Sequence, residues 1–128
     1  MKSIVRLAVI MFAMLPFAGF AQSSKTAWPE MKKFHSFMSS SFHPTEEGNF
    51  KPLRENADSL LITAKAWKAS KIPAGYKVEL TKATLEELVK KCTVIADAVK
   101  EKSIDDELKV LIIDAHDIFH KIVEKCKE

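Results

Sequence analysis

Once its first residues are set aside, the sequence lacks any substantial surplus of charge. The chain has 20 Lys and Arg against 17 Asp and Glu, but Lys2 and Arg6 belong to the N-terminal segment, which leaves 18 against 17. A protein that binds nucleic acid shows a basic stripe or patch, and the sequence contains none. The composition therefore argues against nucleic acid as a partner.

Strand signals, internal repeats and low-complexity tracts are also missing. Tyr76 to Leu80 alternates briefly, but this segment is short and is flanked by helix-forming sequence. No Ser/His/Asp or Cys/His arrangement typical of nucleophilic catalysis is present, so we do not expect an enzyme. Beyond its N-terminal segment, a chain of this length forms one small domain.

The N-terminal segment has the three parts of a secretory signal peptide. Met1 to Arg6 is basic, Leu7 to Phe20 is uncharged, and small residues surround Ala21. The uncharged run is shorter than the about 20 apolar residues that span a bilayer comfortably, and no cysteine lies nearby to carry a lipid. We expect a signal peptide over residues 1–21, export to the periplasm or beyond, and a domain over residues 22–128 without a membrane partner. A retained signal anchor is the alternative.

Apolar residues then recur at three- and four-residue intervals, the pattern of amphipathic helices. The first helix is expected from about Trp28 to Phe42, with Pro29 in its first turn. Pro44 disfavours helical geometry at His43, so we expect a loop there. The apolar stripe of this helix comprises Met31, Phe34, His35, Met38 and Phe42.

Three further helices follow the same pattern. The second begins near Pro52 and ends before Pro73. The third is expected to start at Thr84, where Thr84 and Glu87 have the spacing of a capping box. The fourth starts at Ser103, with acidic residues in its first turn, where the helix dipole favours anions. Short connections between them predict an all-α, up-down-up-down four-helix bundle.

All four histidines fall on the first and last of these helices. His116 and His120 are four residues apart, so on a helix they share one face about 6 Å apart and can reach one metal ion. A rise of about 1.5 Å per residue places His35 level with His120, and Met38 between the levels of His120 and His116. His35 lies in the apolar stripe and is expected to point inward. The flank that carries the pair faces either the first or the third helix, depending on the handedness of the bundle.

This placement predicts a transition-metal site between the first and last helices. The expected ligands are His35, Met38, His43, Glu47, His116 and His120, with Glu46 as an alternative carboxylate. Imidazole suits zinc, copper, iron and nickel, and the thioether of Met38 would favour copper. We expect a zinc or copper carrier, buffer or sensor, as a monomer or homodimer. A structural or partner-binding bundle without a ligand stays open, because each of these residues is also compatible with ordinary packing.

The two cysteines fall on core stripes of adjacent helices. Export would place Cys92 and Cys126 in an oxidising compartment where thiols pair. Helical rise separates them by roughly 10 Å, however, more than the about 7 Å that a disulfide spans between Cα atoms. We expect two buried thiols, while a slipped register leaves a disulfide open and Cys92 is a further candidate metal ligand.

The layout resembles the cytochrome c′ and cytochrome b562 class of exported four-helix bundles over nearly all of residues 22–128. No C-x-x-C-H motif is present, so covalent haem is excluded. The b-type members hold haem between a methionine of the first helix and a histidine of the last. The resemblance therefore implies haem b as an alternative cofactor, in an electron-transfer protein, with Met38 or Met31 and His120 or His116 as its ligands.

A second likeness is to small exported bundle proteins of bacteria, from which no activity can be carried over. It rests on three runs: Met31-x-x-Phe34-His35-x-x-Met38, Phe42-His43-Pro44-x-Glu46-Glu47-Gly48-Asn49 and His116-x-x-Phe119-His120.

Overall fold

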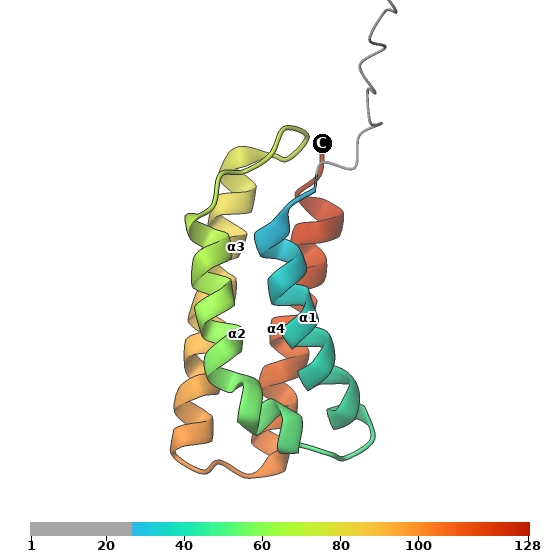
Figure 1. The fold of residues 1–128 in the computed structure, drawn as a ribbon, viewed down its shortest axis with the longest axis vertical. Helices are drawn as coiled ribbons and strands as arrows, with labels where there is room; N and C mark the ends of the chain where they lie inside the picture. The colour runs from blue at the N-terminus through green and yellow to red at the C-terminus, as the bar shows by residue number, and fades with distance from the viewer. Residues whose placement is uncertain (1–26) are drawn as a thin grey trace, which may run out of the picture.

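Four long helices make up most of the chain that the structure describes. The computed structural model describes residues 27–128, so the predicted signal peptide lies outside the described residues. The helices are α1 (Pro29–Glu46), α2 (Lys51–Ala69), α3 (Val78–Lys100) and α4 (Asp105–Lys125). Short connections reverse the chain after each helix, and sequential helices run antiparallel (Figure 1). The all-α four-helix bundle predicted from the sequence is confirmed.

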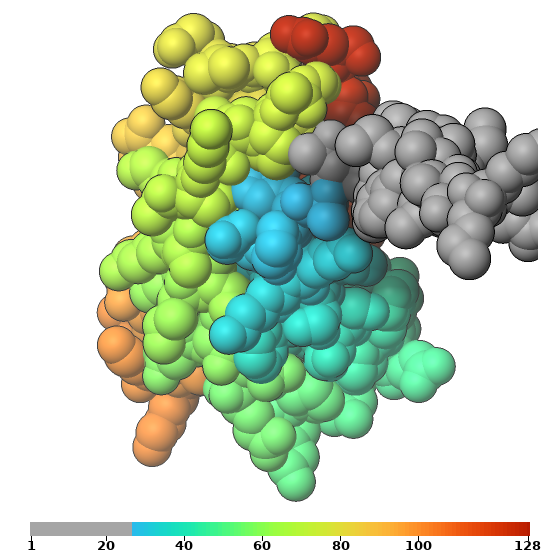
Figure 2. Space-filling view, turned by 45° about the horizontal axis from the view of Figure 1, so that its top comes forward, coloured from blue at the N-terminus to red at the C-terminus, as the bar shows by residue number. Residues whose placement is uncertain are grey.

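The helices pack in a ring in which α1 and α4 close the circle. α2 lies between α1 and α3, α3 packs against α4, and α4 returns to α1, although this last pair packs less closely than the other three. Figure 2 shows α1 and α2 meeting along one side of the bundle. Within residues 27–128, none of the helices combines the length and the apolar character needed to cross a membrane.

Aromatic side chains fill the end of the core at which α1 begins and α4 ends. The ring of Trp67 lies 5.5 Å from that of Phe34 and 5.9 Å from that of Phe119, and Trp28 meets it edge-on at 5.6 Å. The indole N–H of Trp28 donates to the hydroxyl of Ser70 at 2.8 Å. Edge-to-face and tilted pairs of this kind add to the stabilisation that burial alone provides.

The prediction that α1 stops before His43 is wrong. α1 continues through Pro44 to Glu46. Proline removes one backbone donor, and in the last turn of a helix this costs only one bond. The hydroxyl of Thr45 donates to the carbonyl of Phe42 at 2.6 Å and supports the turn. As a result, His43 and Glu46 lie on one helix, three residues apart.

The predicted capping box at Thr84 is also wrong, because α3 begins six residues earlier, at Val78. Thr84 therefore lies in the second turn, where its hydroxyl donates to the carbonyl of Leu80 at 2.7 Å. The start of α4 moves by two residues, from Ser103 to Asp105, and its acidic first turn is as predicted.

The C-terminal residues tie the end of α4 to the connection between α2 and α3. The backbone N–H of Lys77 donates to the carbonyl of Cys126 at 2.7 Å, and that of Glu128 donates to the carbonyl of Gly75 at 2.9 Å. Both cysteines are free and buried. The thiol of Cys126 lies 3.7 Å from the hydroxyl of Thr84. Thr84 and Cys92 are separated along α3 by about 12 Å of helical rise.

Candidate metal centre

Two reciprocal stacks of histidine on phenylalanine join α1 to α4. His35 of α1 stacks on Phe119 of α4, with ring centroids 5.0 Å apart and planes inclined by 4°. Phe42 of α1 stacks on His116 of α4, with centroids 3.8 Å apart and planes again inclined by 4°. The flank of α4 that carries His116 therefore faces α1, which settles the alternative that the sequence left open.

The direction of helical side chains explains which rings meet. Side chains lean toward the N-terminus of their own helix. In an antiparallel pair, His116 therefore leans toward the end of α1, while Phe42 leans back toward its beginning. The two rings approach each other across a difference in backbone level, and Phe42 occupies the position beside His116 that helical rise alone assigned to Met38.

His116 and His120 form a pair whose ring nitrogens face each other. Their Nε2 atoms are 3.2 Å apart, with ring centroids 4.5 Å apart and planes inclined by 69°. Both side chains are partly buried. The predicted pairing of these two histidines on one face of the helix is therefore present, with the two Nε2 atoms directed toward each other.

His120 and His43 each have a glutamate carboxylate beside the Nδ1 atom of the ring. Nδ1 of His120 lies 3.1 Å from a carboxylate oxygen of Glu124, and Nδ1 of His43 lies 3.3 Å from a carboxylate oxygen of Glu46. Sequence reasoning missed Glu124. Its signal was the four-residue spacing from His120, at which helical side chains meet.

Burial lowers the pKa of His116 below the ordinary imidazole value. Charges on His120 and His43 lower this pKa further, whereas those on Asp117 and Glu46 raise it. His43 and Glu46 are therefore within electrostatic reach of His116, although they lie on the other helix. A lowered pKa keeps this imidazole neutral at physiological pH, the state in which it binds a metal.

The remaining expected ligands lie apart from the pair. The prediction that His35 points inward is wrong. The buried positions of α1 are Phe34, Met38, Ser41 and Thr45, and His35, one residue beyond Phe34, is exposed at the edge of this stripe.

Met38 and Glu47 also differ from the histidine pair in their surroundings. Met38 is 1% exposed and belongs to the core. Glu47 is the exposed C-cap residue of α1, and its neighbour Glu46 contacts His43 instead.

Both ring nitrogens of His120 already face other side chains, one toward His116 and one toward Glu124.

The histidine pair has no third protein ligand already in place. Within residues 27–128, no group of three His, Cys, Asp or Glu side chains is arranged to hold a metal ion. Residues 1–26 contain none of these four residue types. An ion held between His116 and His120 would therefore need a side chain to rotate toward it, or would keep open coordination positions.

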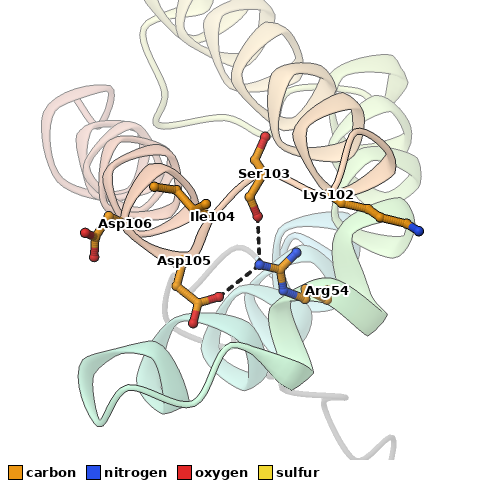
Figure 3. A pocket seen from close by; sticks show the side chains of 6 residues that line it. All are labelled: Arg54, Lys102, Ser103, Ile104, Asp105 and Asp106. Atoms are coloured by element: carbon orange, nitrogen blue, oxygen red, sulfur yellow. Dashed lines mark hydrogen bonds and ion pairs between the residues drawn. The ribbon is translucent and has the colours of Figure 1, made fainter.

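A hollow lies between the start of α2 and the connection from α3 to α4. Figure 3 shows the guanidinium of Arg54 reaching the carbonyl of Ser103 at 2.8 Å and the carboxylate of Asp105 at 2.9 Å. Lys102 and Asp106 point away from this contact (Figure 3). The charge of Arg54 is already paired with Asp105, so this contact fastens the connection to α2.

Comparisons of the chain with protein-family models, curated proteins and solved structures give no match. The geometry of the α1/α4 seam therefore carries the functional argument.

Proposed function

We propose that this protein binds a transition-metal ion on the α1/α4 seam, with Nε2 of His116 and Nε2 of His120 as the first two ligands. One observation carries the proposal: these atoms are 3.2 Å apart. Two nitrogen ligands, each about 2.0–2.1 Å from a tetrahedral zinc ion, lie about 3.3 Å from each other. The pair thus has the spacing of two ligands of one ion before any ion is present.

His43 is the proposed third ligand. Its side chain is 65% exposed at the end of α1, so it is free to rotate, and its charge acts on His116. An ion bound by His43 and the pair would join α1 to α4, the two helices that pack least closely. Glu46, which lies beside His43, is the proposed carboxylate of the site in place of Glu47.

The kind of metal follows from the ligands. Imidazole accepts zinc, copper and nickel, and Met38, buried in the core, offers no soft ligand beside the pair. We propose zinc, with Cu²⁺ as the nearest competitor. Closed four-ligand sites are typical of structural zinc, whereas this pair is partly exposed and leaves positions open. Such a site suits an exported carrier or buffer that gains and releases its ion.

Zinc titration of the purified chain tests this proposal. We expect one ion per chain with a dissociation constant below about 10 μM. At a zinc concentration about one hundred times this constant, the native state gains about 2.7 kcal/mol, which raises the melting temperature by about 10 °C. His116→Ala should remove this gain and leave the helical circular dichroism unchanged. His35→Ala is the matched control, since it removes the other stacked histidine of the seam.

Two results would move the function elsewhere. Equal zinc binding by the His116→Ala chain would exclude the pair as the site. No stabilisation by zinc or copper, together with a Soret band on adding haem b, would favour the haem alternative. No response to either would favour a bundle that binds no small ligand.

A further inference from the structure

The carboxylate of Glu124 lies on the far side of His120 from His116. It lies 3.1 Å from Nδ1 of His120, while Nε2 of the same ring faces His116. An ionised carboxylate only accepts hydrogen bonds, and a neutral imidazole carries its single proton on one nitrogen. In a neutral His120 that keeps this contact, the proton is therefore on Nδ1, and Nε2 carries the lone pair.

This assignment determines the hydrogen bond between the two histidines. In the metal-free chain, Nε2 of a neutral His120 has no proton and accepts a hydrogen bond from Nε2 of His116 across the 3.2 Å separation. To bind an ion through Nε2, His116 must carry its proton on Nδ1 instead, so that both Nε2 atoms present lone pairs. A free histidine side chain in water prefers the opposite tautomer, with its proton on Nε2. That tautomer would direct the lone pair of Nδ1 at the carboxylate of Glu124 and leave no lone pair on the nitrogen that faces His116.

We propose that Glu124 is a positioning residue of the metal site, which selects the tautomer of His120 that presents Nε2 to the ion. The inference rests on the proposed metal-binding function. Histidine ligands of metals usually donate their other ring N–H to a carboxylate or carbonyl, which fixes the ring and makes the ligating nitrogen more basic. Glu46 stands in the same relation to His43 on α1, at 3.3 Å.

The contact of Glu124 differs from the ordinary ion pairs of the helix surfaces. Lys51 with Glu55 and Lys90 with Glu86 also pair at a four-residue spacing, but their closest atoms are 3.8 Å apart. Exposed lysine pairs at such spacings contribute little to stability. The Glu124 contact is shorter, at 3.1 Å, and its partner is a ring that is held on its other nitrogen as well.

Long-range proton–nitrogen NMR of the metal-free full chain tests the inference, together with zinc titration. At about pH 8 we expect the wild-type His120 to carry its proton on Nδ1. In Glu124→Ala the proton should move to Nε2, and zinc affinity should fall by about 10-fold or more. Glu86→Ala is the matched control, because it removes an exposed helical carboxylate from α3 and should change neither reading.

The possible outcomes separate this inference from the proposed function. A wild-type His120 with its proton on Nε2 would overturn the inference, as would a Glu124→Ala chain that binds zinc as tightly as the wild type. A wild-type chain that binds no zinc would overturn the proposed function, and with it any role of Glu124 in metal binding. Weaker zinc binding with an unchanged tautomer would mean that Glu124 acts by its charge alone, which also contradicts the inference.

Discussion

Helix α4 packs against its two neighbours in different ways. Toward α3 the helices are close, and the ion pairs Lys91–Asp114 and Lys121–Glu87 flank the contact at 3.4 and 3.7 Å. Toward α1 the packing is looser, and aromatic rings contact each other across it, with His35 on Phe119 and Phe42 on His116.

The difference separates stability from chemistry on two faces of one helix. Tight apolar packing on the α3 side removes water and offers a ligand nothing to bind. Flat rings hold α1 to α4, while His116 and His120 stay partly exposed. Under the proposed function, the same helix is fixed on its α3 face and exchanges an ion on its α1 face.

The largest expected effect is the low reactivity of Cys92, a fully buried thiol on α3, compared with an ordinary exposed thiol. Burial raises its pKa to about 12. Because the thiolate is the reactive form, an ordinary thiol with a pKa of about 8.5 should react about a thousand times faster at about pH 8. Iodoacetamide followed by mass spectrometry should find Cys92 unmodified in the native chain and modified in concentrated guanidinium chloride. Rapid labelling of the native chain would show that this side is not closed to water.

Truncating a core side chain of α3 should lower the free energy of unfolding more than truncating a side chain on the α1 side. Leu88 is fully buried on α3, and Leu88→Ala should lower the free energy of unfolding by about 2–5 kcal/mol, through lost burial and the cavity it leaves. Urea unfolding measures the change. Val94, on the same helix, is 47% exposed, and Val94→Ala should stay within about 0.5 kcal/mol. Equal losses in both variants would contradict the position of the core.

Truncation on the α1 side should cost less stability and more binding. Phe42 is partly buried, so Phe42→Ala should lower the free energy of unfolding by about 1–2 kcal/mol. It also removes the face on which His116 stacks, and zinc affinity should fall with it. Phe37→Ala is the control, since Phe37 is another partly buried phenylalanine of α1. Zinc affinities reduced alike by the two variants would show that the stack has no special role.

The smallest expected effect is a dependence of stability on pH. The pKa of His116 is lowered in the folded chain, mainly by burial, so near pH 6 the unfolded chain binds this proton more readily. Stability from this group is complete above the ordinary pKa of about 6.5 and is lost as the pH falls toward the lower folded value. In metal-free urea unfolding, stability should fall less for His116→Gln than for the wild type on acidification. An equal loss of stability in the two chains would exclude His116 as the source of the pH dependence.

Much of the fold followed from local patterns, and the errors lay where tertiary contacts override them. The spacing of apolar residues located all four helices. It could not show that α1 passes through Pro44, because the cost of one missing bond is small in a last turn. Nor could it show that Thr84 lies within α3 and not at its start. A threonine three residues before a glutamate occurs both at helix N-termini and along the surface of a helix.

Within the candidate site, the pair of histidines was predictable and its surroundings were not. The four-residue spacing of His116 and His120 is a property of one helix. The stack of Phe42 on His116 depends on how two helices are set against each other, which a single sequence does not specify. His35 was misplaced because it lies about 100° around the helix from Phe34, a turn that moves a side chain from the core to its edge.

A crystal structure of the zinc-soaked protein, phased with the anomalous signal of the metal, would show whether His116 and His120 hold one ion. We predict one anomalous peak per chain on the α1/α4 seam, about 2.0–2.1 Å from both Nε2 of His116 and Nε2 of His120. A zinc ion bound only elsewhere on the chain, with these two nitrogens still facing each other unbridged, would contradict the account.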